Sequence, residues 1–398
     1  MRQAMGVCVL MLAACSGGNS SSISAVDGSS SVAQIHRIAP HAAPPPAQAS
    51  QLEITEVASG LQVPWSLAFL PDGQMLVTER PGRLRYVSSE GVLSEPIAGV
   101  PEVYSEGQGG LLDVALSPDF ANDHWVYLSY AEAGSDDRAG TALGRGRLVG
   151  DHIEDWQVIF RQEPKLSSGQ HFGSRIVFDR IGHLFLALGE NNQRSTAQQL
   201  DHLQGKIVRL FPDGSIPPDN PFVGTEGARP EIWSYGHRNQ QGAALNPLTG
   251  QLWTSEHGPR GGDEVNIPQA GKNYGWPLAT YGINYSGQAI PEAVGTTAPD
   301  TEPPFYWFER SPGLSGMAFY TAQRFPAWQG SLFLGGLATR ELIRLQLDGE
   351  TVVAEEHLLA ERPTRLRDVR QGPDGYLYAL SEMDGTILRI GLKPTSAP

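Results

Sequence analysis

Residues 369–380 read VRQGPDGYLYAL: an apolar run, a tight Pro-Asp-Gly turn and a second apolar run. The turn supplies the positive φ of a β-hairpin, and β-branched and aromatic residues flank it. The same arrangement occurs six times, in segments 65–78, 112–130, 175–188, 242–254, 316–335 and 369–380. One hairpin cannot bury its apolar face alone, so neighbouring copies must stack. The repeat therefore predicts an all-β fold, a six-bladed β-propeller whose loops gather around one axis.

The composition agrees with one turn-rich unit. A length of 398 residues would allow two or three domains, but the repeat implies a single closed one. The chain contains 46 glycines and 30 prolines, and only segment 195–209 is a candidate for a short helix. A net charge of −14 without a basic run argues against nucleic acid or an anionic membrane surface as a partner. Lysine is scarce, so cationic contacts to a ligand fall mainly to Arg.

The first 50 residues carry processing signals. Residues 1–14 have a positive start and an apolar core too short to span a bilayer, and are predicted to be a lipoprotein signal peptide. The stretch LAAC, ending at Cys15, resembles a bacterial lipobox in which Cys15 is lipidated; an ordinary secretory signal is the alternative. Residues 15–50 are then the lipidated Cys and a flexible linker, followed by the propeller domain at 51–398.

These signals predict a lipoprotein on the periplasmic side of the outer membrane or at the cell surface, touching the membrane only through its lipid. Cys8 leaves with the signal peptide, and Cys15 is acylated. The folded domain therefore contains no thiol, which excludes disulfides, Cys-ligated zinc and a Cys nucleophile.

Three segments between the repeats, 107–113, 168–175 and 235–266, hold more polar residues than strand packing requires. Arg238 and Asn239 lie in a Gly-flanked loop, where a guanidinium beside an amide suits bidentate recognition of a carboxylate or quinone oxygen. A loop Arg in a surface salt bridge is the other reading. His171 is either structural or a general base, and Glu190 could accept a hydrogen bond from its ring.

Segment 258–264 reads GPRGGDE and combines irregular glycine backbone with paired carboxylates. Free carbonyls and carboxylate oxygens are the ligands that Ca²⁺ prefers, at six to eight per ion. The spacing is not that of an EF-hand, so calcium and a plain acidic turn both remain open.

Together these segments resemble the soluble quinoprotein glucose/sorbosone dehydrogenase family, and most of all its aldose sugar dehydrogenase branch. The resemblance runs in collinear order from about residue 52 to residue 391. It is carried by GQGGLL (107–112), QHFGSR (170–175), YGHRN (235–239), SEHGP (255–259), DEVN (263–266), GKNYGWP (271–277) and RLRDV (365–369).

The resemblance implies a pyrroloquinoline quinone (PQQ) site on the propeller axis. The residues expected to bind the cofactor are Gln108, Arg238, Asn239, Arg365 and Arg367. The carbonyls of Gly258 and Pro259 would hold one Ca²⁺ that also contacts PQQ, and Glu264 with the carbonyl of Tyr274 would hold a second, structural Ca²⁺. Ala338 stands where family members carry a Lys that contacts PQQ, and Arg340 is the neighbouring cation that could replace it.

The reaction so implied is the oxidation of aldose sugars at C1 to the lactone. His171, oriented by Glu190, takes the proton of the anomeric hydroxyl while a hydride leaves C1 for the quinone, and calcium with Arg238 stabilises the developing charge. Electrons then pass to a quinone or a small redox protein. Aromatic residues of segments 281–288 and 303–308 are expected to border the sugar, and a monomer or homodimer is expected. The alternatives are a PQQ-free ligand-binding propeller and a calcium-dependent sugar lactonase.

Overall fold

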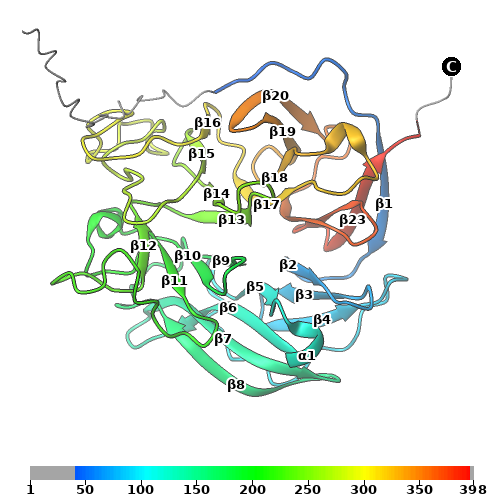
Figure 1. Ribbon diagram of the computed structural model, residues 1–398, viewed down its shortest axis with the longest axis horizontal. Coiled ribbons are helices and arrows are strands. Elements are labelled where there is room, and N and C mark those ends of the chain that lie inside the picture. Colours follow the sequence, from blue (N-terminus) through cyan, green and yellow to red (C-terminus); the bar gives the residue numbers. More distant parts are fainter. Residues whose placement is uncertain (1–40, 395–398) are drawn as a thin grey trace, which may run out of the picture. The chain divides into compact units, whose positions relative to one another are not determined.

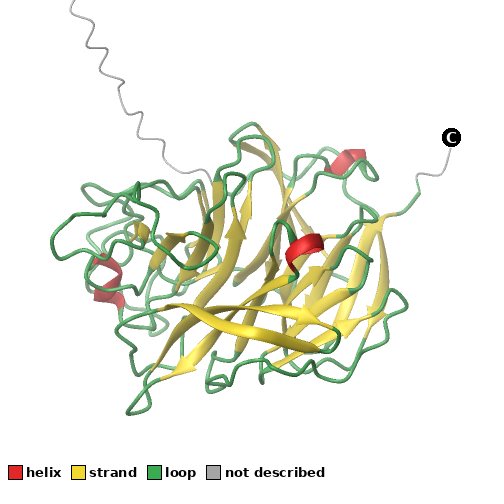
Figure 2. Ribbon diagram, turned by 60° about the horizontal axis from the view of Figure 1, so that its bottom comes forward, coloured by secondary structure: helices red, strands yellow, loops and turns green. Residues whose placement is uncertain are grey.

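Six antiparallel sheets surround a central axis in the computed structural model, which describes residues 41–394 (Figures 1 and 2). Helical structure in this range is limited to α1 (Phe120–Asp123) and the 3₁₀ turns η1 (Arg194–Gln198) and η2 (Pro326–Trp328). The predicted six-bladed β-propeller is confirmed. The predicted signal peptide and Cys15 lie outside the described residues. Within those residues, no helix is long and apolar enough to cross a membrane.

The blades follow the chain in order, with one exception at the ring closure. The first three blades are β2 (Pro64–Phe69), β3 (Met75–Glu79) and β4 (Arg83–Val87); β5 (Leu111–Leu116), β6 (Trp125–Ala133), β7 (Ala139–Val149) and β8 (His152–Arg161); and β9 (Gly173–Phe178), β10 (Leu184–Leu188), β11 (Lys206–Leu210) and β12 (Ile232–Tyr235). The last three are β13 (Gln240–Leu245), β14 (Leu252–Glu256), β15 (Asp263–Asn266) and β16 (Tyr306–Phe308); β17 (Leu314–Phe319), β18 (Leu332–Gly336), β19 (Leu342–Asp348) and β20 (Thr351–Leu358); and β21 (Leu366–Gln371), β22 (Leu377–Ser381), β23 (Thr386–Leu392) and β1 (Leu52–Ala58).

The six hairpins of the sequence repeat are the first two strands of the six blades. The short helix expected over 195–209 is wrong beyond its first turn. Only η1 is helical there, and β11 begins at Lys206, which pairs with Tyr235 of β12. Pairing between distant strands overrides the weak local helix preference of this segment.

The ring closes between the two ends of the described chain. β1 pairs antiparallel with β23, with Leu52 opposite Leu392 and Ile54 opposite Ile390. Figure 1 shows these strands, blue and red, side by side. The outer strand of the last blade, β1, is followed directly in the chain by β2, the inner strand of the first blade. Separating these two blades would therefore require breaking the whole β1–β23 ladder.

Apolar clusters fill all six interfaces between neighbouring blades. They join β3–β4 to β5–β7, β6–β7 to β9–β11, β10–β11 to β13–β14, β14–β16 to β17–β19, and β17–β18 to β21–β23. The sixth cluster closes the ring, with Leu67 and Val77 of the first blade packed against Leu380 and Ile387 of the last. Burial of apolar surface between every pair of blades therefore stabilises the closed circle.

Four charged side chains from three inner strands meet at the axis and are here named the axis cluster: Asp113, Arg175 and Asp368, which are buried, and Arg370, which is half-buried. Arg175 lies 3.1 Å from Asp113 and 3.0 Å from Asp368, and Arg370 lies 2.9 Å from Asp368 and 3.1 Å from Asp113. Both carboxylates therefore contact both guanidinium groups. The cluster is neutral overall, which is the condition under which buried charges are tolerated.

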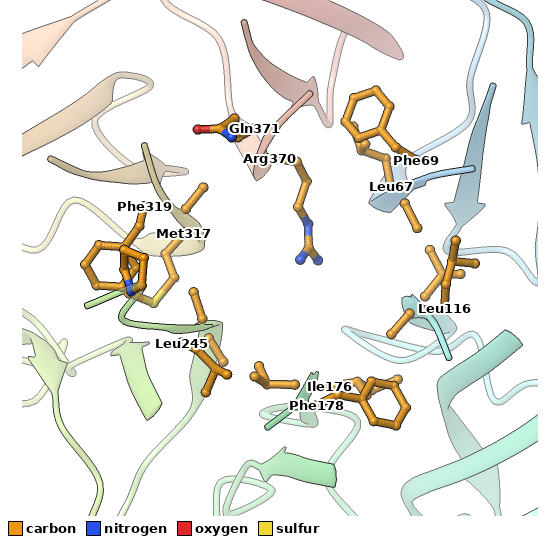
Figure 3. Close-up of a pocket in the computed structure, with 18 of the residues that line it drawn as sticks. Leu67, Phe69, Leu116, Ile176, Phe178, Leu245, Met317, Phe319, Arg370 and Gln371 are labelled. Atoms are coloured by element: carbon orange, nitrogen blue, oxygen red, sulfur yellow. The ribbon is translucent and has the colours of Figure 1, made fainter. Parts of the chain in front are cut away.

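Below the axis cluster lies an apolar basin of about 480 Å³, bordered by the ends of the six inner strands. Figure 3 shows Arg370 reaching toward its centre from among apolar side chains such as Leu67, Phe178 and Met317. None of the site residues predicted from the sequence borders this basin. The predicted site residues therefore lie away from this end of the axis.

The last ten residues of the predicted linker, 41–50, contact the propeller. The ring of His41 stacks on Trp307 at 4.3 Å between centroids. The hydroxyl of Ser50 donates to Glu356 at 2.9 Å. This part of the segment is therefore held against the blades by specific contacts.

Candidate functional site

His171 lies in the loop that leads into the inner strand β9, and its backbone has an unusual conformation. Its φ is 52°, and that of Ser174 is 93°, both in the left-handed region. The backbone at His171 passes close to Gly189, and only glycine allows this approach, because a Cβ on residue 189 would lie 1.9 Å from the carbonyl oxygen of His171. Such strained backbone at an interior loop is often found at functional sites.

The imidazole of His171 is oriented by a buried carboxylate. Its Nδ1 lies 2.6 Å from Oε2 of Glu190, which also accepts the backbone N–H of Asn192 at 2.9 Å. Burial alone would raise the pKa of Glu190, but the charges of His171 and Arg238 and the hydrogen bonds hold it below its ordinary value. Glu190 is therefore ionised at neutral pH, and Nδ1 is the donor of this pair. The second nitrogen, Nε2, is left for a ligand.

The other predicted residues are connected to this pair. Oε1 of Gln108 accepts the backbone N–H of His171 at 2.9 Å, and the carbonyl of Arg238 accepts the N–H of Glu190 at 2.9 Å. Oδ1 of Asn239 accepts the backbone N–H of Gly173 at 3.1 Å. The structure therefore brings Gln108, His171, Glu190, Arg238 and Asn239 together, although they are spread over more than a hundred residues of sequence.

A cavity of about 700 Å³, here called the axial cavity, lies beside this network. Gln108, Asn239, Arg365 and Arg367 border it, together with Phe172, which follows His171. Its volume is in the range of small-molecule and cofactor sites. Glu382 lies 3.0 Å from Arg365 and 2.7 Å from Arg367, so a single carboxylate holds both guanidinium groups. The cavity keeps an excess of positive charge, which suits an anionic ligand.

A second cavity of about 680 Å³, the side chamber, shares His257, Leu337 and Arg365 with the axial cavity. Ala338 borders the side chamber together with Arg310, whereas Arg340 borders neither cavity. Arg260 also borders the side chamber, so Arg260 and Arg310, and not Arg340, share this chamber with Ala338.

Of the aromatic residues expected near a sugar, Tyr285 borders the side chamber and is 75% exposed. Trp307 is instead stacked within the protein, with His41 at 4.3 Å and Tyr281 at 4.2 Å. Trp307 borders neither cavity, and its contact with the sugar stays a prediction.

The four predicted calcium ligands, Gly258, Pro259, Glu264 and Tyr274, border one small cavity next to Arg238. Burial raises the pKa of Glu264 well above its ordinary value, and the nearby carboxylate of Glu256 adds to the shift. Burial also raises the pKa of Glu256 to about 8. Two buried carboxylates that resist ionisation side by side are stabilised in the charged form by a cation.

The donors around this cavity fit a hard cation. A Cβ on Gly258 would lie 2.3 Å from the carbonyl oxygen of Gly262 and 2.4 Å from that of Gly261, so oxygens converge where glycine leaves room. Oδ1 of Asn266, beside Glu264, is buried without a partner among the described residues. Among the described residues, 41–394, no three His, Cys, Asp or Glu side chains lie close enough together to hold a metal ion. Backbone carbonyls would therefore supply most of the ligands, and Ca²⁺ accepts carbonyl oxygens as ligands.

Three residues of the site were missed from the sequence. Glu382 bridges Arg365 and Arg367, and Gln241 bonds to Arg367. His257 borders the axial cavity, the side chamber and the small cavity of the predicted calcium ligands. Burial, and then the charges of Arg367 and Arg238, lower the pKa of His257 well below its ordinary value. Gln241 and His257 lie in the polar segment 235–266, and this polar composition is the sequence feature that could have identified them. Nothing local marks Glu382.

Comparison with known proteins gives consistent matches. A family model described as Glucose / Sorbosone dehydrogenase matches residues 61–389. The aldose sugar dehydrogenase YliI of Escherichia coli (strain K12) is 57% identical over 334 residues, which are 83% of this chain and 90% of that protein. A crystal structure of a glucose dehydrogenase is 62% identical with a TM-score of 0.85, covering 86% of this chain and 100% of that chain. The PQQ-bound aldose sugar dehydrogenase of Streptomyces coelicolor is 30% identical with a TM-score of 0.70, covering 88% and 100%.

Proposed function

Because this chain belongs to the glucose/sorbosone dehydrogenase family of oxidoreductases, we propose that it oxidises aldose sugars at C1 to the lactone with PQQ and Ca²⁺. The observation that carries the proposal is the axial cavity. Arg365, Arg367, Asn239 and Gln108 border it, and Gln108 also contacts the His171–Glu190 pair. Electrons are then proposed to pass to a quinone or a small redox protein.

The residues present fit the cofactor. Arg365 donates to Glu382 and to the carbonyl of Leu337, and Arg367 to Glu382 and Gln241, so each guanidinium keeps N–H groups for a ligand carboxylate. When bound, PQQ would accept a hydride from C1 of the sugar. The carbonyls of Gly258 and Pro259 would hold one Ca²⁺, and Glu264 with the Tyr274 carbonyl a second.

The residues of the chain would handle the proton. Nε2 of His171 takes it from the C1 hydroxyl, because Nδ1 is engaged by Glu190. The ionised carboxylate of Glu190 stabilises the imidazolium that forms. As the O–H and C1–H bonds break, the C1–O bond becomes double. Nη1 of Arg238 donates to the carbonyl of His257 at 2.9 Å. The guanidinium of Arg238 would stabilise the negative charge that develops on the quinone oxygen.

Titration of the purified apoprotein tests the proposal. PQQ and Ca²⁺ together should give a protein that reduces an artificial dye with glucose or another aldose, and neither should do so alone. Chelation should abolish the reaction, and added Ca²⁺ should restore it. Binding of PQQ without any aldose oxidation would favour a binding propeller. Hydrolysis of sugar lactones without PQQ would favour a lactonase.

We propose, as expected from the sequence, that the mature protein is a lipoprotein anchored through Cys15 on the periplasmic side of the outer membrane or at the cell surface. The lipobox-like stretch at its N-terminal end supports this location. Metabolic labelling with a fatty-acid analogue should mark the wild type and not a Cys15→Ala variant. Equal labelling of both would refute the anchor.

A further inference from the structure

We propose that Gln241 is a positioning residue, which fixes Arg367 and Asn239 in the orientation in which they bind the cofactor. The proposal rests on the PQQ-dependent function proposed above. Gln241 is the second residue of the inner strand β13, is 7% exposed and borders the axial cavity. Its side chain lies between the two cofactor residues and joins one to the other.

The hydrogen bonds of Gln241 leave only one orientation for its amide. Nη1 of Arg367 lies 2.8 Å from the Gln241 side chain. A guanidinium can only donate, so Oε1 of Gln241 must face Arg367. Nε2 of Gln241 then faces Asn239, at 3.2 Å from Oδ1, and also the carbonyl of Gly173 at 3.4 Å.

This orientation in turn fixes the amide of Asn239. Oδ1 of Asn239 receives N–H groups from both Gln241 and Gly173, so the oxygen is turned toward the protein. Its amide nitrogen has no hydrogen-bond partner in the described part of the chain. Asn239 therefore presents two N–H donors to the axial cavity, which it borders.

Arg367 is held on two sides. Its Nε and Nη2 donate to Oε1 of Glu382 at 3.2 and 2.7 Å, and its Nη1 donates to Gln241. Three of the five N–H groups of a guanidinium are thus used, and two remain for a ligand. Without Gln241, Arg367 would be held along the Glu382 edge alone, and the free edge could rotate away.

The main chain of Gln241 is itself fixed by the core. Its carbonyl accepts a hydrogen bond from Nε of Arg175 at 2.7 Å. Arg175 belongs to the axis cluster and is 2% exposed. Gln241 therefore connects the rigid centre of the propeller to the groups that contact the cofactor, which is how precise sites are supported.

The neighbouring residue supplies a matched control. Gln240 lies on the same strand and is fully buried, but neither polar atom of its amide has a partner among the described residues. Gln241→Leu and Gln240→Leu therefore remove the same chemical group at adjacent positions. Gln241→Met, whose side chain has similar length, replaces Gln241→Leu if the latter does not fold.

Two measurements test whether Gln241 positions Arg367 and Asn239. The dissociation constant of PQQ for the apoprotein should rise about tenfold in Gln241→Leu and change by less than about twofold in Gln240→Leu, as for loss of one bond to a charged donor. Crystal structures of the apo variants should show Arg367 or Asn239 turned from its wild-type orientation only in the Gln241 variant.

Two results would overturn the proposal: equal PQQ affinity of Gln241→Leu and wild type, or unchanged orientations of Arg367 and Asn239 in the crystal structure of the variant. A wild-type protein that does not bind PQQ would refute the proposed function instead, and the crystal structures would still decide the role of Gln241.

Discussion

Replacing Glu190 by Gln tests how much the buried carboxylate contributes to the proposed general base. Oε2 of Glu190 accepts both the ring N–H of His171 and the backbone N–H of Asn192, so the carbonyl oxygen of Gln should occupy this position and keep both bonds. The tautomer of His171 is then unchanged, and only the negative charge is lost. Oε1 of Glu190 is buried without a partner among the described residues, so the amide nitrogen of Gln would be unsatisfied there.

The size of the effect follows from the two kinds of hydrogen bond. A bond to a charged group contributes about 1.5–3 kcal/mol and a neutral one about 0.5–1.5 kcal/mol, so the charge is worth roughly 1–1.5 kcal/mol to the protonated base. Since about 1.4 kcal/mol is a factor of ten, kcat/KM of Glu190→Gln should fall roughly 5- to 15-fold. His171→Ala, which removes the base itself, should lose about 10²–10⁴-fold.

The assay is dye reduction by an aldose with PQQ and Ca²⁺ in excess, and PQQ affinity is measured separately as a control. Because the pKa of Glu190 is lowered in the folded state, its contribution is present above the ordinary carboxyl pKa and disappears as the pH falls through the lower folded value. The wild-type rate should thus show no step from Glu190 near neutral pH. A Glu190→Gln enzyme with wild-type kcat/KM, or one whose only defect is PQQ affinity, would refute the reasoning.

Three further predictions concern stability. Arg175→Met should lower the free energy of unfolding by about 3–5 kcal/mol, because it leaves two buried carboxylates with one guanidinium; thermal melting measures the loss. Chelation of Ca²⁺ should lower the melting temperature of the wild type, and Glu264→Gln should abolish most of this shift because it removes the charged ligand. Contacts with Glu355 and Glu341 raise the pKa of His357 to about 9, so its stabilisation is complete below pH 6.5 and is lost as the pH rises through 9; comparing melting curves of wild type and His357→Gln between pH 6 and 10 tests this.

Each of these predictions has a clear contrary outcome. An Arg175→Met protein that melts with the wild type would show that the axis cluster is energetically neutral. An unchanged melting curve after complete removal of Ca²⁺ would refute the structural calcium site. Parallel pH dependence of wild type and His357→Gln would mean that this imidazole does not carry its proton to high pH.

Local sequence was sufficient for the repeat. A hairpin turn such as 371–375, with alternating apolar residues around it, specifies its own strands through short-range sterics and burial, so all six inner hairpins were predicted correctly. The family resemblance rested on continuous motifs, and the family match over residues 61–389 confirms it. The predicted site residues stand in such motifs, and their chemical roles remain predictions.

The outer strands carried a weaker signal. β8 reads HIEDWQVIFR, and most of its residues are exposed or half-buried, so no clean alternation marks it. The pairing of β1 with β23 joins residues more than three hundred apart in the chain, which no local pattern indicates. The helix predicted over 195–209 failed for the same reason, because β11 is defined by its partners.

The sequence by itself determined the blade and the types of residue available for chemistry. It determined the blade because turn chemistry and apolar periodicity act between residues that are near neighbours in the chain. Only the tertiary structure decided which side chains meet. Glu382 joins Arg365 to Arg367, Gln241 joins Arg367 to Asn239, and Arg175 supports Gln241 from the axis. The Glu382 contacts lie within the last blade, whereas the contacts of Gln241 with Arg367 and with Arg175 connect different blades. The geometry of these contacts between blades exists only after the ring has closed, because closure brings the first residues of all six inner strands to one end of the axis.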